Sequence, residues 1–259
     1  QKPEKENQMA PEREFTRREF IGSAAATAAV TIVPRHVLGG PGYVPPSDKL
    51  NVGYVGCGTQ GMREMAYLIQ NPDIQIVSVC DPNKFTTDYV DWSLNGIRDS
   101  IRKVLEDDTW GEGLEGVPGG RDIGQNFVER YYGKNKPGGN YKGCPSYEDF
   151  REMLEKEKDI DAIKIMTPDH LHATISIAAI NKGMHVVIHK PIANRIDEAQ
   201  KVFKAAREHP EVSTHLLAWS IRPGYELSLK WIKDGAIGTL KEIHNWSNRP
   251  VWPQFTSNP

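Results

Sequence analysis

The 259-residue sequence lacks three features that would assign it at once to a familiar class of protein. Its three cysteines are too few and too scattered for a disulfide framework, and they form no C-x-x-C pair of the zinc-binding kind. It has no basic excess, because 32 Lys and Arg stand against 34 Asp and Glu, so we expect neither a nucleic-acid nor an anionic-membrane partner. It also lacks an apolar run of about 20 residues, the length that a membrane-spanning helix needs.

The longest apolar run, residues 20–33, follows the pair Arg17 and Arg18 and has 14 residues. Paired arginines before such a run are typical of a twin-arginine signal, which directs folded proteins out of the cytoplasm. We therefore predict a signal segment over 1–40, the export machinery as a partner and a periplasmic location, with a membrane tether if the leader stays uncleaved. The alternative is a disordered N-terminus with a chance arginine pair. Residues 41–49, rich in Pro and Gly, are predicted to be a linker.

From residue 50 onward, apolar runs of strand length alternate with segments of helical spacing. Strands are expected at 50–55, 74–81, 161–166, 184–188 and 214–219, with helices at 62–70, 147–155, 170–183 and 195–208. This alternation predicts an α/β fold, a doubly wound parallel sheet of the Rossmann type over 50–218. Residues of about 85–146, rich in glycine, are interpreted as an insertion that is helical near 91–106 and 127–132. A helix at 225–235 and a strand at 240–246 would begin an α+β mixed-sheet substrate domain over 219–259.

The strongest chemical signal is the segment G-Y-V-G-C-G-T-Q-G-M, in which Gly56, Gly58 and Gly61 match G-x-G-x-x-G. The match follows a predicted strand, opens a predicted helix and precedes Asp81 by 20 residues, as in the dinucleotide fingerprint. The helix N-terminus would bind the pyrophosphate, and Asp81 the ribose hydroxyls. A carboxylate repels a 2′-phosphate, so NAD is predicted over NADP, although the positive charge of nearby Lys84 weakens that preference.

The predicted cofactor site also includes Thr59, Gln60 and Met62. The alternative is a glycine-rich turn with no nucleotide.

Four motifs in order make the chain resemble the Gfo/Idh/MocA oxidoreductases: G-x-G-x-x-G, V-C-D-P-N, T-P-D-H-L-H-A and H-K-P. The resemblance implies a nicotinamide-dependent enzyme with a carbohydrate substrate, and it implies a homo-oligomer. It assigns Lys190 as the catalytic, nicotinamide- and substrate-contacting lysine. It also places Thr167, Pro168 and His172 beside the cofactor.

This sequence departs from the family's Glu-Lys-Pro motif, because His189 stands where the glutamate is expected. An imidazole would not hold a proton on the neighbouring lysine as a carboxylate does, and burial lowers a lysine pKa further. We therefore assign His189 to the catalytic group, with Lys190 as the more easily neutralised base. Arg222, after the last predicted strand of the sheet, is a candidate substrate contact, with a structural ion pair as its alternative. A metal bound by His170, His172 and His189 is disfavoured, because the two rings of H-x-H point apart.

Three functions remain open on this sequence. The first is an NAD(P)-dependent oxidoreductase acting on a sugar or sugar derivative. The second is a glycoside hydrolase that oxidises, eliminates and reduces with the same cofactor. The third is a non-catalytic nucleotide- or sugar-binding protein. Folded export agrees with the first two, because an exported enzyme would have to load its nicotinamide in the cytoplasm and keep it. The 219–259 segment is expected to be an incomplete domain, since the family's further catalytic residues would follow it.

Overall fold

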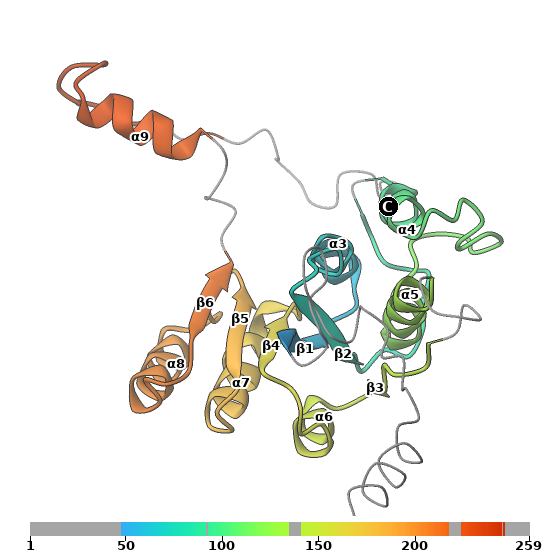
Figure 1. Cartoon of the computed structure of the whole chain (residues 1–259). Helices are drawn as coiled ribbons and strands as arrows, with labels where there is room; N and C mark the ends of the chain where they lie inside the picture. Colours follow the sequence, from blue (N-terminus) through green and yellow to red (C-terminus); the bar gives the residue numbers. More distant parts are fainter. Residues whose placement is uncertain (1–47, 92, 135–140, 218–223, 245, 247–259) are drawn as a thin grey trace, which may run out of the picture. The chain divides into compact units, whose positions relative to one another are not determined.

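A computed structural model describes residues 48–91, 93–134, 141–217, 224–244 and 246 (Figure 1). The predicted signal segment, most of the predicted linker and Arg222 lie outside these residues. Among the residues described, no helix combines the length and the apolar character needed to cross a membrane.

Six parallel strands form one sheet in the order β3-β2-β1-β4-β5-β6. The strands are β1 (Leu50–Val55), β2 (Ile74–Cys80), β3 (Ser146–Tyr147), β4 (Ala162–Ile165), β5 (His185–His189) and β6 (Thr214–Leu217). Apolar runs suit the inner strands, because helices cover a parallel sheet on both faces. The predicted doubly wound Rossmann sheet is therefore confirmed. The order reverses between β1 and β4, which is the switch point where such sheets bind ligands.

The helices divide between the two faces of the sheet (Figure 1). One face carries α3 (Thr59–Leu68), α4 (Gly96–Leu105) and α5 (Arg121–Gly133). The other carries α6 (Phe150–Lys156), α7 (Asp169–Ile180) and α8 (Ile196–Glu208). This division follows from right-handed crossovers that run first one way and then the other from the switch point.

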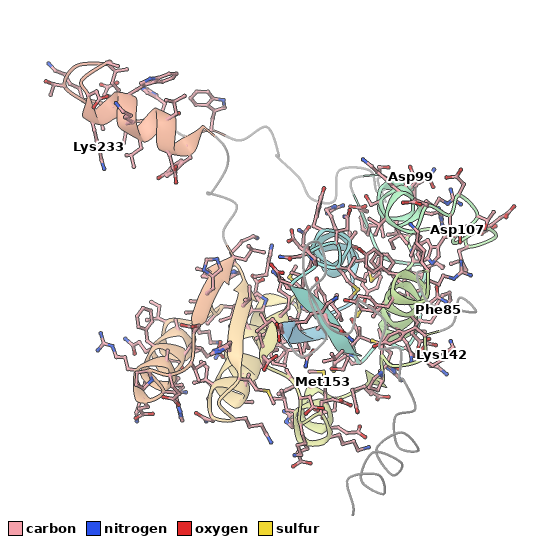
Figure 2. All side chains as sticks on the ribbon, viewed as in Figure 1. Phe85, Asp99, Asp107, Lys142, Met153 and Lys233 are labelled. Atoms are coloured by element: carbon pink, nitrogen blue, oxygen red, sulfur yellow. The ribbon has the colours of Figure 1, made fainter. Side chains whose placement is uncertain are left out.

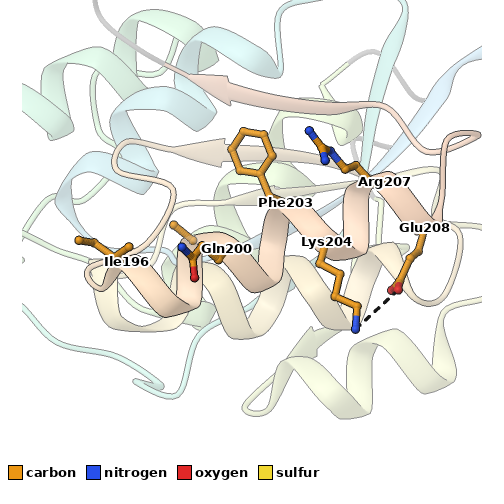
Figure 3. A pocket seen from close by; sticks show the side chains of 7 residues that line it. Ile196, Gln200, Phe203, Lys204, Arg207 and Glu208 are labelled. Atoms are coloured by element: carbon orange, nitrogen blue, oxygen red, sulfur yellow. Dashed lines mark ion pairs between the residues drawn. The ribbon is translucent and has the colours of Figure 1, made fainter.

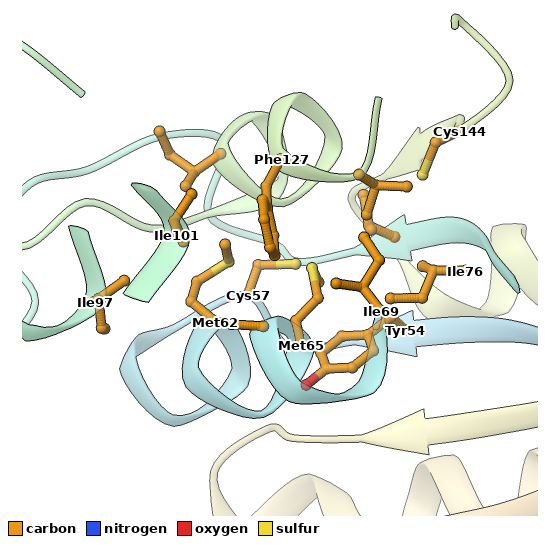
Figure 4. Close-up of a cluster of buried hydrophobic side chains, with 14 of the residues drawn as sticks. Tyr54, Cys57, Met62, Met65, Ile69, Ile76, Ile97, Ile101, Phe127 and Cys144 are labelled. Atoms are coloured by element: carbon orange, nitrogen blue, oxygen red, sulfur yellow. The ribbon is translucent and has the colours of Figure 1, made fainter. Parts of the chain in front are cut away.

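The predicted insertion contributes to the hydrophobic core (Figure 4). Phe127 of α5 and Ile101 of α4 are fully buried, and they pack in one cluster with Met62 and Met65 of α3. The helical parts predicted near 91–106 and 127–132 correspond to α4 and α5. Charged side chains such as Asp99 and Lys142 stay on the outside (Figure 2). The insertion is thus a folded layer over β1 and β2.

A second hydrophobic core lies on the opposite face of the sheet. It joins Ile163 and Ile165 of β4 to Ile175 of α7, all fully buried. The alternation along β4 sends Lys164, between the two isoleucines, toward the other face. The two cores hold the central strands from both sides.

Residues 224–244 contain α9 (Tyr225–Lys233), where a helix over 225–235 was expected. The expected strand over 240–246 is not observed, because residues 240–244 and 246 carry no strand assignment. An alternating sequence becomes a strand only when a partner strand takes up its backbone hydrogen bonds. The short strand β3 was not predicted, since two residues carry no periodicity.

Phe127→Ala should lower the free energy of unfolding by about 3–5 kcal/mol, because it leaves a cavity in a closed core. Phe203→Ala is the matched control: Phe203 is 61% exposed on α8. Its loss should change stability by at most about 0.5 kcal/mol. Urea unfolding followed by circular dichroism measures both. Equal effects from the two variants would contradict the insertion's place in the core.

Candidate nucleotide-binding site

The turn after β1 can be made only by glycine at position 56. Gly56 has φ +101°, and a Cβ built on it would lie 2.6 Å from the carbonyl carbon of Met166 and 2.8 Å from the nitrogen of Thr167. Any side chain would therefore push apart the ends of β1 and β4. The Gly56 N–H donates to the Cys80 carbonyl at 2.8 Å, which also ties the turn to β2. The first glycine of the motif thus joins three strand ends.

The third glycine of the motif sets how closely α3 approaches the sheet. A Cβ on Gly61 would lie 2.0 Å from the carbonyl oxygen of Gly56, well inside van der Waals contact. The buried Tyr54 hydroxyl donates to the Gly61 carbonyl at 2.7 Å and fastens the helix to β1. The geometry matches the helix–strand packing role that the fingerprint gives to this glycine.

The N-terminus of α3 is suited to an anion. Its N-cap is Gly58, which has no capping side chain, and the first turn contains no acidic residue. The dipole and the first N–H groups of a helix favour a phosphate at such an end. Of the other predicted contacts here, Thr59 and Gln60 are half-buried, whereas the Met62 side chain is fully buried in the core. Only the backbone of Met62 could face a ligand.

Asp81 follows β2 and lies beside the glycine loop. It is 6% exposed, and its Oδ2 accepts from the Cys57 N–H at 2.7 Å while Oδ1 accepts from the Asn83 N–H at 2.8 Å. Burial raises the pKa of this carboxyl, and these two hydrogen bonds oppose the rise. Each carboxylate oxygen keeps a second lone pair, which is what the hydroxyls of a ribose require. The loop thus fixes the orientation of the predicted ribose-binding group.

His172 connects the turn after β4 to the segment after β5. The ring is fully buried, with Nδ1 2.5 Å from the Pro191 carbonyl oxygen and Nε2 2.8 Å from the Thr167 carbonyl oxygen. Both ring nitrogens therefore face backbone within the protein, which favours a positioning role over direct contact with a cofactor. The hydroxyl of Thr167 is buried and has no partner among the described residues. A polar group of a bound cofactor would satisfy it.

His189 ends β5 directly before Lys190. Burial lowers the pKa of His189, and the positive charge of Lys190 lowers it further. The histidine is 9% exposed and its Nε2 is buried without a partner within the described part of the chain, whereas Lys190 is exposed. The peptide bond between Lys190 and Pro191 is cis. A neutral imidazole therefore stands where the family carries a glutamate.

A buried lysine next to this pair was missed in the sequence. Lys164 of β4 is 6% exposed, and burial lowers its pKa while Glu64 of α3 acts against the change. The same two residues influence His189, with Glu64 raising and Lys164 lowering its pKa. In the sequence Lys164 is one polar position in an apolar run, and only the fold shows that it is buried and influenced by Glu64.

The predicted residues converge on one edge of the sheet. Gly56, Asp81, Thr167 and Lys190 follow β1, β2, β4 and β5 at their carboxyl ends, where parallel sheets bind ligands. In the described ranges, no group of three or more His, Cys, Asp or Glu could hold a metal ion. A hollow of about 680 Å³ runs along α8, lined by Ile196, Ala199, Gln200, Phe203, Lys204, Arg207 and Glu208 (Figure 3). It contains none of the predicted site residues.

Fold and site together define a dinucleotide-binding Rossmann domain. Residues 127–215 match the model of the GFO_IDH_MocA family, described as an oxidoreductase family with an NAD-binding Rossmann fold. The match covers about a third of the chain, and it agrees with the resemblance to the Gfo/Idh/MocA oxidoreductases seen in its motifs. The matched stretch contains Thr167, His172 and Lys190, while the glycine loop precedes it. The family description agrees with the prediction of NAD.

Two curated relatives illustrate the family. The chain is 34% identical over 115 residues to levoglucosan dehydrogenase of Pseudarthrobacter phenanthrenivorans, covering 42% of this chain and 29% of that protein. It is 24% identical over 207 residues to a glycosyl hydrolase family 109 protein of Shewanella pealeana, covering 74% of this chain and 37% of that one. The chain thus spans about a third of the length of these relatives.

Solved structures of dehydrogenases resemble the chain at low identity. The apo scyllo-inositol dehydrogenase from Lactobacillus casei gives a TM-score of 0.48 at 20% identity, covering 74% of this chain and 43% of that one. The myo-inositol 2-dehydrogenase from Lactobacillus plantarum gives 0.47 at 20% identity, covering 73% and 42%.

The lowered pKa of His189 predicts a pH dependence of stability. Below its ordinary pKa of about 6.5, the unfolded chain binds a proton that the folded chain resists, so folding weakens as pH falls. The contribution of this group is fully present above that pH. His189→Gln should reduce the loss of stability between about pH 6.5 and pH 5, measured by urea unfolding. His170→Gln, an exposed position on α7, is the control. An unchanged slope in the His189 variant would contradict the assignment.

Proposed function

We propose that this chain supplies the cofactor domain of an NAD-dependent oxidoreductase acting on a sugar or sugar derivative. The observation that carries the proposal is the convergence of Gly56, Asp81, Thr167 and Lys190 at one carboxyl edge of the sheet. Gly56 and Asp81 are suited to binding the pyrophosphate and ribose of a dinucleotide. Lys190 has an amine that can transfer a proton. Levoglucosan dehydrogenase is a relative whose name includes a sugar substrate.

Different residues of the domain would bind different parts of the dinucleotide. The N-terminus of α3 would hold the pyrophosphate, and Asp81 the adenosine ribose. The Asp81 carboxylate favours NAD over NADP because it repels a 2′-phosphate. The buried hydroxyl of Thr167 would hydrogen-bond to the nicotinamide half. Bound nicotinamide supplies the acceptor for a hydride from a sugar carbon.

Lys190 acts as the acid and base of the reaction. Its amine takes the proton from the substrate hydroxyl as the hydride leaves the adjacent carbon, and it returns that proton in the reverse direction. The imidazole of His189, whose pKa is lowered by burial and then by the charge of Lys190, directly precedes this amine. His172 fixes the Lys190–Pro191 segment against the Thr167 turn through its two contacts to carbonyl oxygens.

A second candidate function is glycoside cleavage by oxidation, elimination and reduction. It is favoured by the glycosyl hydrolase family 109 proteins of Shewanella pealeana and Stenotrophomonas maltophilia, which align with 74% and 66% of this chain. The same domain would serve it, because the hydride removed first is returned at the end. The two functions differ in their products.

Export by the twin-arginine route to the periplasm belongs to the same proposal. A folded, loaded enzyme keeps its nicotinamide where no supply exists, which is why we propose a tightly held cofactor. We also propose that the protein forms a homo-oligomer.

The full-length protein, assayed with free sugars and with the matching nitrophenyl glycosides, tests both functions. A sugar oxidoreductase forms a ketosugar or lactone, whereas the hydrolase releases nitrophenol with no net change in nicotinamide. In either case Lys190→Ala should lower kcat by about 10²–10⁴-fold. Lys182→Ala, an exposed lysine after α7, should not. If Lys190→Ala keeps full activity on the best substrate, its catalytic role is wrong.

A further inference from the structure

An aromatic ring from the insertion lies against the glycine loop. A Cβ built on Gly58 would lie 3.3 Å from Cε1 of Tyr89, and one on Gly119 would lie 2.5 Å from Cδ2 of the same ring. Tyr89 is therefore in contact with both glycines. Its ring occupies the space that a side chain at either position would need. Gly58 is the residue whose bare backbone is expected to approach the pyrophosphate. The ring thus borders the place predicted for the middle of the dinucleotide.

Tyr89 also borders the predicted ribose site. Burial raises the pKa of its phenol, and the charge of Asp81 raises it further, while a hydrogen bond with the Asn83 side chain acts the other way. The phenol is therefore neutral near pH 7, and it lies close to the carboxylate that would bind the ribose. One side chain adjoins both the pyrophosphate loop and the ribose-binding group.

The backbone around Tyr89 is fastened to α3 by two neighbouring contacts. The Thr59 hydroxyl donates to the Val90 carbonyl at 2.9 Å. Arg63 forms an ion pair with Asp91, whose side chain is fully buried while that of Arg63 is 20% exposed. Removing one partner of a buried ion pair is destabilising, so this contact should hold the segment firmly to α3.

A second segment of the insertion, residues 117–120, is hydrogen-bonded to the backbone around Tyr89. The N–H of Gly119 donates to the Thr86 carbonyl at 2.9 Å, and the N–H of Val117 donates to the Thr87 carbonyl at 2.8 Å. The Gly120 N–H donates to the Cys57 carbonyl at 2.9 Å, inside the glycine loop itself. Residues 86–91 and 117–120, named here the strap, are therefore bound to the loop and to each other.

We propose that Tyr89 forms one wall of the site for the adenosine half of a dinucleotide, and that the strap slows the release of that ligand. The inference rests on the proposed function, because it presumes that a dinucleotide binds at the loop. It assigns a role to the insertion: the strap, whose two segments are joined by isolated bridges, contacts the glycine loop at Cys57 and Gly58. A cofactor held in this way suits an enzyme that must retain it.

The test measures NADH release from the full-length protein, by stopped-flow fluorescence with excess NAD as the displacing ligand. Tyr89→Ala should release NADH about tenfold faster or more, the change expected when a tyrosine ring that borders a bound ligand is truncated. Tyr89→Phe keeps the ring and should stay within about twofold of the wild type. Arg63→Gln, which removes one fastening contact without altering Tyr89, should also speed release.

Tyr67→Ala is the matched control, because Tyr67 lies on α3 and is 71% exposed. Its release rate should equal that of the wild type. A purely structural role for Tyr89 would lower the melting temperature and leave the NADH release rate unchanged, and that result would overturn the proposal. Slower release from Tyr89→Ala would overturn it too, since the ring would then obstruct the site. A wild type that binds no NADH at all would instead count against the proposed function.

Discussion

The contact of Gly56 with the backbone of Met166 and Thr167 determines the geometry of the whole edge. These residues end β1 and β4, the two central strands, from which the helices diverge to opposite faces of the sheet. Because there is no side chain between them, the two strand ends meet and the chain turns directly into α3. Gly61 then allows α3 to lie on that turn, and its N-terminus faces the edge. The anion site, the ribose-binding group and the Thr167 turn are arranged by this one close approach.

The electrostatics of the edge differ from one end to the other. Asp81 is a buried carboxyl held by two backbone N–H groups on the adenosine side. At the end of β5, burial lowers the pKa of His189, and the charges of Lys190 and Lys164 lower it further while Glu64 acts the other way. The first arrangement leaves lone pairs that could accept from hydroxyl groups, and in the second an imidazole directly precedes the proposed base. The replacement of glutamate by histidine is thus accompanied by a buried lysine on the adjacent strand.

Much of the fold and part of the site could be predicted because their signals are local. The segments that form β1, β2, β4, β5 and β6 are rich in apolar residues. The spacing of Gly56, Gly58 and Gly61 can be recognised within a single short segment. The strap could not be predicted, since Tyr89 meets Gly58 through an irregular segment with no periodicity. The two contacts of His172 depend on a strand pairing between β4 and β5, and a strand expected over 240–246 was not observed. Contacts between distant residues are decided by packing, which a single sequence does not display.

We propose that this domain binds and retains NAD. The full-length protein should be purified without added nucleotide, denatured and filtered, and the nucleotide in the filtrate identified by mass spectrometry. We expect close to one NAD or NADH for each chain, with little NADP. A filtrate without nucleotide, from protein that is folded by circular dichroism, would contradict retention. Recovery of NADP in place of NAD would contradict the role given to Asp81.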